Sequence, residues 1–150
     1  MTERRARRTV GRSGLTGALL AVLWVVPLVG AEGPAGDEEH ALLMPLASSS
    51  LLLDVAAGDG WLVAVGERGH VLVSRDDGRT WVQKPAPTRA TLTAVAVHGA
   101  ELAWAVGHDE VVLGTRDGGE TWQRLRAAPE EERPLLDVAF EDPLHGIAIG

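Results

Sequence analysis

The sequence predicts an all-β fold, and two observations carry that prediction. Short apolar runs rich in Val and Leu are separated by Gly, Asp and Pro, and none has the spacing of a helix with one apolar face. The same series of runs returns after 41 residues, so that a motif ending at Trp81 recurs as a motif ending at Trp122. Each repeat offers four such runs, which is the content of one blade of a β-propeller. We therefore expect a β-propeller, to which this chain contributes about two and a half four-stranded blades.

The motif that closes each repeat reads Ser/Thr-x-Asp-x-Gly-x-Thr-Trp, the pattern known as the Asp-box or BNR repeat. An Asp in a tight turn can accept backbone N–H bonds, Gly supplies positive φ, and the Trp ring can cover the turn. An apolar run precedes the motif and a mixed run follows it, which indicates a hairpin. We expect a structural role for its defining residues, which are Ser74, Asp76, Gly78 and Trp81 in the first copy and Thr115, Asp117, Gly119 and Trp122 in the second.

The N-terminal segment has the pattern of a signal peptide. A basic stretch from Arg4 to Arg12 precedes an apolar run from Leu15 to Val29. The run ends in Val29-Gly30-Ala31, which fits the small-x-small rule, so a cut is expected after Ala31. About fifteen residues are short of the roughly 20 that a membrane span needs, and an uncleaved anchor is the alternative. We expect residues 1–31 to direct export to the periplasm or the cell exterior. Contact with the membrane is expected only through this segment, and only if it stays uncleaved.

Residues 32–47 form an acidic linker rich in Gly and Pro. The propeller part is expected to cover 48–150, with blades at about 52–89 and 92–134 and a partial blade at 135–150. Propellers close with four to eight blades, so we expect this to be the N-terminal part of a longer propeller. If the chain ends there, open sheet edges favour marginal stability or self-association.

Composition narrows the classes of function. The chain has no Cys, which excludes disulfides, thiolate metal sites and Cys nucleophiles. The formal net charge is −7, and residues 32–150 hold nine Lys and Arg against 20 Asp and Glu, which argues against nucleic acid as a partner. The five His show no zinc spacing, and Asp76-Asp77-Gly78 lacks the other ligands of a calcium loop. We expect no metal and no cofactor.

An enzyme is the alternative class, because Asp-boxes were first recognised in sialidases. Those enzymes use a Tyr nucleophile, and this chain has no Tyr, so residues 1–150 alone cannot assemble that site. Asp76 and Asp117 occupy equivalent places in successive repeats, on separate turns too far apart to act on one bond. We expect a non-enzymatic protein. The alternatives are a sialidase-like glycoside hydrolase with catalytic residues beyond residue 150 and a carbohydrate-binding propeller.

The linked pattern from Val65 to Trp81, with Trp104 to Asp109 and Thr115 to Trp122 in register behind it, resembles the photosystem II assembly/stability factor-like propellers. The resemblance covers about two-thirds of the chain. It implies a seven-bladed propeller and a scaffold that binds protein, with a membrane-protein assembly intermediate as partner. It also implies the thylakoid lumen as location if the organism is photosynthetic. Contacts are expected from loops on the rigid frame, such as 85–87 and 128–134.

Two features depart from the family pattern. Glu110 stands in the second repeat where the first has Gly69, so we expect a less regular turn there. The resemblance also implies a basic patch in the photosynthetic members. This chain shows no such concentration, because its basic residues are interleaved with acidic ones, namely Arg124, Arg126 and Arg133 with Glu130, Glu131 and Glu132.

Overall fold

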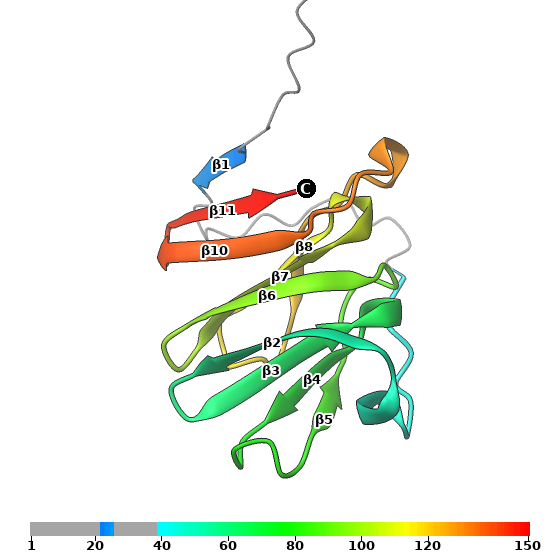
Figure 1. Ribbon diagram of the computed structural model, residues 1–150, viewed down its shortest axis with the longest axis vertical. Coiled ribbons are helices and arrows are strands. Elements are labelled where there is room, and N and C mark those ends of the chain that lie inside the picture. Colours follow the sequence, from blue (N-terminus) through cyan, green and yellow to red (C-terminus); the bar gives the residue numbers. More distant parts are fainter. Residues whose placement is uncertain (1–21, 26–38) are drawn as a thin grey trace, which may run out of the picture.

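The computed structural model describes residues 22–25 and 39–150. They form three antiparallel sheets that follow one another along the chain and stack side by side (Figure 1). The predicted all-β propeller fold is confirmed, since the described residues contain strands and short 3₁₀ turns but no α-helix. The 3₁₀ turns are η1 (Ala47–Ser49), η2 (Glu67–Gly69), η3 (His108–Glu110) and η4 (Pro129–Glu131).

The first two sheets are complete four-stranded blades in which each strand pairs with the next one in sequence. Both blades carry the same irregularity: the pairing shifts after Leu52 in the first and after Leu92 in the second. The strands are β2 (Leu52–Gly58), β3 (Trp61–Gly66), β4 (Val71–Ser74) and β5 (Val82–Lys84), then β6 (Leu92–His98), β7 (Leu102–Gly107), β8 (Val112–Thr115) and β9 (Gln123–Arg126).

The third sheet holds a hairpin and a strand from the N-terminal segment. The hairpin consists of β10 (Asp137–Asp142) and β11 (His145–Ile149), and β1 (Val22–Val25) pairs with the other edge of β11. The sequence did not predict β1, because Val22–Val25 belong to the expected signal peptide. The rest of residues 1–31, and residues 32–38 of the expected linker, lie outside the described residues, so both assignments stay predictions.

The main hydrophobic core lies between the first two blades. Strand β4 is buried along its whole length. Val71 and Val73 pack in the core shared with the second blade, and Leu72 packs with Ala47 and Ala64 in a separate cluster. Fully burying a Val or Leu side chain contributes about 1.5–3 kcal/mol, so this layer contributes strongly to the stability of the described chain. Its members include Val63, Val65, Val71, Val73, Leu92, Val95, Ala103, Ala105, Val111 and Leu113.

A second core joins the second blade to the β10–β11 hairpin. Trp104 is 2% exposed and stacks on Phe140, with ring centroids 3.6 Å apart and planes inclined by 9°. Ala94, Val106 and Val138 pack in the same cluster. Consecutive blades therefore meet through apolar faces, as expected for a propeller.

The outermost faces of the three-sheet stack carry exposed apolar side chains, including Val55 on β2 and Ile147 and Ile149 on β11. The chain before the first blade is docked on that blade, since the Ala41 N–H donates to the Ala86 carbonyl at 2.9 Å. No helix in the parts of the chain that the structure describes has the length and apolar character to span a membrane.

Candidate functional site

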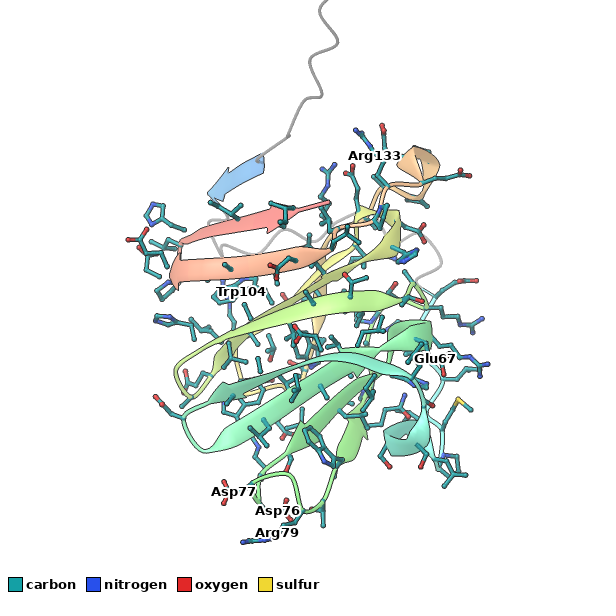
Figure 2. All side chains as sticks on the ribbon, in the orientation of Figure 1. Glu67, Asp76, Asp77, Arg79, Trp104 and Arg133 are labelled. Atoms are coloured by element: carbon teal, nitrogen blue, oxygen red, sulfur yellow. The ribbon has the colours of Figure 1, made fainter. Side chains whose placement is uncertain are left out.

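The first Asp-box turn joins β4 to β5, and Figure 2 labels Asp76, Asp77 and Arg79 in it. The turn is closed by its own side chains. Asp76 accepts hydrogen bonds from the Ser74 hydroxyl at 2.9 Å, from the Thr80 N–H at 2.8 Å and from the Thr80 hydroxyl at 2.7 Å. The Ser74 oxygen accepts the Gly78 N–H at 2.9 Å. The Trp81 indole N–H donates to the Gly78 carbonyl at 3.1 Å, so the ring spans the base of the turn.

The second Asp-box turn, between β8 and β9, repeats this network. Asp117 accepts from the Thr115 hydroxyl at 2.8 Å and from the Thr121 N–H and hydroxyl at 2.9 and 2.6 Å. The Gly119 N–H donates to Thr115 at 3.0 Å, and the Trp122 indole donates to the Gly119 carbonyl at 3.1 Å. Both glycines have positive φ, 81° at Gly78 and 87° at Gly119, a region that favours glycine.

The hydrogen bonds within the two turns favour the ionised form of the Asp76 and Asp117 carboxylates, because they lower the pKa of each. The Thr80 hydroxyl and N–H, with help from Ser74, lower the pKa of Asp76. Burial opposes ionisation of Asp117, but hydrogen bonds from Thr121 and Thr115 outweigh it and lower the pKa of that carboxyl. Because the folded pKa lies below its unfolded value, each Asp stabilises the fold above the ordinary Asp pKa and loses that contribution as pH falls below it.

The second Asp-box turn differs from the first in being docked on the preceding blade. Gly119 lies so close to Trp61 and Val73 that a Cβ there would be 2.9 and 2.8 Å from their side chains. The equivalent Cβ at Gly78 would meet nothing nearer than 3.5 Å. Trp122 is 7% exposed as a result, so the second turn forms part of the contact between blades.

A polar clamp holds this docked turn from the side of the first blade. Arg75 donates to the Gly118 carbonyl at 2.6 Å, pairs with Glu120 at 3.3 Å, and lies over the Trp61 ring at 5.3 Å from its centroid. Lys84 binds the other carboxylate oxygen of Glu120 at 2.5 Å. The hydrogen bond from Lys84 is the main cause that lowers the pKa of Glu120.

A second link between these blades joins β2 to β6, the first strand of each blade. Asp54 accepts the N–H of Val55 at 2.8 Å with one oxygen and the N–H of Val95 at 2.8 Å with the other. On β10, Asp137 accepts the N–H of Val138 at 2.8 Å in the same way as Asp54 accepts that of Val55. Both aspartates stand in a Leu-Asp-Val-Ala segment of the sequence, and nothing in that pattern indicates that the Asp54 carboxylate bridges two blades.

The expectation of a less regular turn at Glu110 is wrong. Arg68 and Asp109 have φ values of 56° and 59°, and Glu110 adopts positive φ (49°) just as Gly69 does (72°). The Glu110 carboxylate binds Arg126 and also Arg133 at 3.3 Å, and these bonds hold the strained backbone in place. Two of the three arginines that lie among glutamates in the sequence, Arg126 and Arg133, are therefore tied to the frame.

The two loops expected to present contacts differ. Loop 85–87 exposes only Pro85, because Ala86 and Pro87 are buried. Loop 128–134 carries exposed glutamates, and Arg133 marks its place at the opposite end of the molecule from Asp76 in Figure 2. The second loop therefore offers the larger accessible surface.

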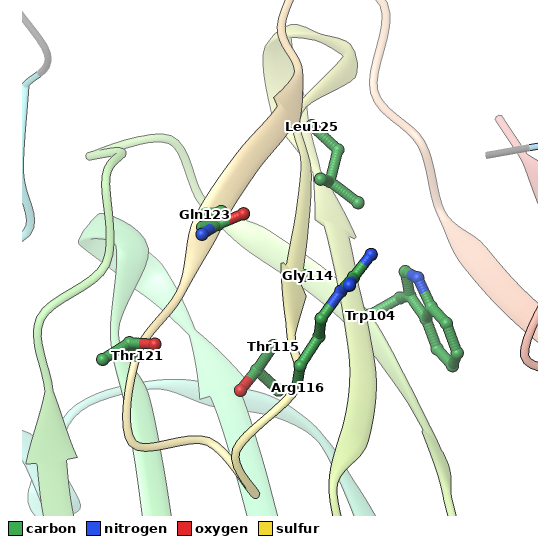
Figure 3. Close-up of a pocket in the computed structure, with 7 residues that line it drawn as sticks. All are labelled: Trp104, Gly114, Thr115, Arg116, Thr121, Gln123 and Leu125. Carbon is green, nitrogen blue, oxygen red and sulfur yellow. The ribbon is translucent and has the colours of Figure 1, made fainter. Parts of the chain in front are cut away.

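The hollow shown in Figure 3 is too small to hold a substrate. Its volume is about 50 Å³, room for a few water molecules, whereas pockets for small ligands measure roughly 300–1,000 Å³. No group of three His, Asp or Glu in the described part of the chain could hold a metal ion. The hollow is lined by Trp104, Gly114, Thr115, Arg116, Thr121, Gln123 and Leu125.

Stacked four-stranded sheets, each closed by an Asp-box turn, define a β-propeller of the BNR-repeat class. The family described as photosynthesis system II assembly factor YCF48 matches residues 38–130. The chain belongs to this family.

Relatives and a solved structure agree with that assignment. The photosystem II stability/assembly factor HCF136 of Arabidopsis thaliana is 32% identical over 98 residues, 63% of this chain and 24% of that protein. The same factor of Oryza sativa is 28% identical over 116 residues, 69% of this chain and 27% of that protein. YkuO of Bacillus subtilis is 31% identical over 74 residues, 49% of this chain and 25% of that protein. The chain spans about a quarter of the length of these curated relatives.

A solved structure described as YCF48 bound to D1 peptide has the same fold. Its TM-score is 0.56 at 23% identity, and the match covers 69% of this chain and 34% of that chain.

Proposed function

We propose that this chain belongs to an exported, non-enzymatic propeller scaffold that binds protein and assists the assembly of a membrane complex. The family match over residues 38–130 carries the proposal. Relatives named stability/assembly factors, and a structure of one family member described with a D1 peptide, support an assembly factor over the sialidase-like alternative. The partner class is a membrane-protein assembly intermediate, and the propeller binds it through a peptide segment of that partner.

A structural role for the Asp-box residues is part of this proposal. Both oxygens of Asp76 and of Asp117 accept hydrogen bonds from their own turns. Their pKa values are lowered, whereas a general acid that works near neutral pH needs a raised pKa. The eight defining residues therefore hold the frame, and the chemistry of recognition falls to exposed loops.

Export is the third part of the proposal. It is supported by the basic and apolar pattern of residues 1–31 and by the cleavage rule at Ala31. The compartment is the periplasm or the cell exterior, or the thylakoid lumen in a photosynthetic organism. Fusion of residues 1–31 to a reporter that matures only after export tests this directly, and a reporter that stays in the cytoplasm contradicts it.

Loop 128–134 is the surface that we assign to the partner, because it is acidic, exposed and tied at its base to the frame through Arg133. Acidic side chains on a rigid base suit a partner segment with basic residues. The test is a pull-down from detergent-solubilised membranes with the tagged chain. We expect enrichment of membrane-protein precursors, reduced when Glu130, Glu131 and Glu132 are all changed to Lys.

The matched control is Glu141→Lys, which changes the charge of an exposed residue on β10 away from the loop. It should leave recovery unchanged. Recovery of no membrane protein by the unaltered chain contradicts the proposed function. Equal losses in the loop variant and the control contradict only the assignment of the loop.

A further inference from the structure

Loop 128–134 belongs to a connection that is longer than its counterpart in the first blade. Trp122 precedes Leu135 by two residues more than Trp81 precedes Leu92. The turn η4 lies in this connection and projects from one end of the stacked sheets, where it is drawn in orange in Figure 1. A longer connection loses more conformational freedom when it is ordered, so an ordered one needs contacts that hold it.

The turn η3 holds this loop at both of its ends. The Ala128 N–H donates to the Asp109 carbonyl at 2.8 Å, and the Glu110 N–H donates to the Arg133 carbonyl at 3.0 Å. The two oxygens of the Glu110 carboxylate add side-chain bonds: one accepts the Arg126 Nε–H at 3.1 Å, and the other pairs with Arg133 at 3.3 Å. Arg126 is the last residue of β9, so one carboxylate ties the end of that strand to the end of the loop.

The first blade has no carboxylate at the place of Glu110. Gly69 stands there, and a Cβ on it would lie 2.2 Å from the Thr88 carbonyl oxygen, so no side chain fits. In the second blade Glu110 adopts positive φ as Gly69 does, at 49° against 72°, and Asp109 before it has φ of 59°. Positive φ is unfavourable for residues that carry a Cβ. The chain accepts this strain at a position from which a carboxylate reaches two arginines.

The bonds to Glu110 also affect which charges the loop presents. The Glu110 side chain is only 13% exposed, so its charge acts on the arginines more than on the surrounding solvent. Arg133 pairs in addition with Glu131 at 2.5 Å. The positive charge of Arg133 is therefore balanced by two carboxylates, whereas Glu130 and Glu132 are exposed beside it. The surface of the loop is negative although an arginine lies in it.

We propose that Glu110 is a positioning residue: by binding Arg126 and Arg133 it fixes loop 128–134 and balances the charge of Arg133, which makes the loop select a partner segment rich in Lys and Arg. This inference rests on the proposed function, which assigns the loop to the partner. The Glu110 carboxylate is largely buried, so it acts through the arginines and not by touching the partner. A fixed array of charges binds a complementary segment better than a mobile one, because less conformational entropy is lost on binding.

The variant Glu110→Gly removes the carboxylate and keeps the backbone, because glycine accepts positive φ at no steric cost. Asp109→Gly is the matched control, since it removes one negative charge and one residue of positive φ from the same turn but leaves Glu110 in place. The readout is hydrogen exchange, measured by NMR, of the Ala128 and Glu131 amides, which are hydrogen-bonded in the folded loop. We expect exchange about tenfold faster in Glu110→Gly, because bonds between charged groups are the strong ones, and little change in Asp109→Gly.

The variant Arg133→Gln breaks the same link from the side of the loop and should also speed exchange of these amides. Exchange no faster in Glu110→Gly than in Asp109→Gly overturns the positioning role. If Glu110→Gly does not fold, Arg133→Gln decides, and unaltered exchange in that variant overturns the role as well.

Binding of a charged probe tests the selectivity, which a role in stability alone would not change. The probes are two labelled synthetic peptides, one of alternating Lys and Ala and one of alternating Glu and Ala, and binding is followed by fluorescence anisotropy. The unaltered chain and Asp109→Gly should prefer the Lys peptide, and Glu110→Gly should bind it about threefold to tenfold more weakly than Asp109→Gly does. No preference for the Lys peptide in the unaltered chain, or equal affinity of the two variants, overturns the selectivity.

The membrane pull-down tests the proposed function separately from the role of Glu110. An unaltered chain that recovers no membrane protein contradicts the proposed function, whatever the exchange of the loop amides shows. Recovery of membrane proteins together with equal exchange in Glu110→Gly and Asp109→Gly supports the function and overturns the role of Glu110.

Discussion

The two complete blades have nearly the same backbone, yet their Asp-box turns have different surroundings. Each turn is closed by equivalent hydrogen bonds from Asp76 or Asp117 to neighbouring Ser or Thr groups. Only the second turn rests on a preceding blade, through Gly119. The comparison teaches that the motif makes the turn by itself, whereas the neighbouring blade decides how much the turn contributes to the fold.

The largest effect is expected where two blades share one aromatic contact. Changing Trp104 to Ala removes a 2% exposed ring stacked on Phe140, and such truncations cost about 3–5 kcal/mol. Trp81→Ala is the comparison, because the Trp81 ring is only partly buried at an outer turn. Urea unfolding followed by circular dichroism should show the larger loss for Trp104→Ala. Equal losses would mean that the contact between blades contributes little.

The glycines of the two turns sharpen the comparison. Gly78→Ala is expected to destabilise by about 1–2 kcal/mol, because positive φ is unfavourable for Ala. Gly119→Ala carries the same backbone cost and also crowds Trp61 and Val73, and overpacking adds about 1–3 kcal/mol. The free energy of unfolding, measured for both variants, should rank them in that order. The reverse order would contradict the docking of the second turn.

A buried histidine distinguishes the first blade from the second. His70 is fully buried, and neither ring nitrogen has a hydrogen-bond partner among the described residues, whereas the second blade has Val111 at this place. A buried unsatisfied polar group costs about 1–3 kcal/mol, so His70→Val should raise the free energy of unfolding, less the cost of a smaller side chain. Val111→His is the reciprocal change and should lower it.

The same histidine predicts a dependence of stability on pH. Burial lowers the pKa of His70, so between the folded and unfolded pKa values the unfolded chain binds a proton that the folded chain does not. Stability should therefore be full above the ordinary His pKa of about 6.5 and fall as pH decreases below it. Thermal unfolding from neutral to mildly acidic pH should show a shallower decline for His70→Val. Parallel declines would exclude His70 as the cause.

The smallest effect concerns the clamp between the blades. Arg75→Ala removes the pair with Glu120, which is about half exposed, and exposed pairs contribute roughly 0.2–1 kcal/mol. Arg79→Ala, an exposed arginine of the same turn, is the control. The difference between the two variants should shrink in high salt, as screening of an ion pair requires. A difference that salt leaves unchanged would assign the effect of Arg75 to its Gly118 hydrogen bond and its contact with Trp61.

The repeat made most of the frame predictable, because strands, turns and Asp-box residues recur with fixed spacing. The contacts between blades were not predictable in this way. Arg75 recurs as Arg116 in the second copy of the motif, and nothing in the sequence pairs Arg75 with Glu120. Strand β1 was missed since an apolar run after a basic one also fits a signal peptide, and only the geometry of β11 shows a place for it.

The second Asp-box turn rests on side chains that the first blade supplies, namely Trp61, Val73 and Arg75. The dependence runs in one direction along the chain: the earlier blade supplies the surface, and the later turn occupies it. A chain that emerges from its N-terminus, at the ribosome or across a membrane, thus completes this surface before the turn that packs on it has appeared. For these two blades the order along the chain therefore also gives an order of assembly, in which the first blade is the template for the turn of the second.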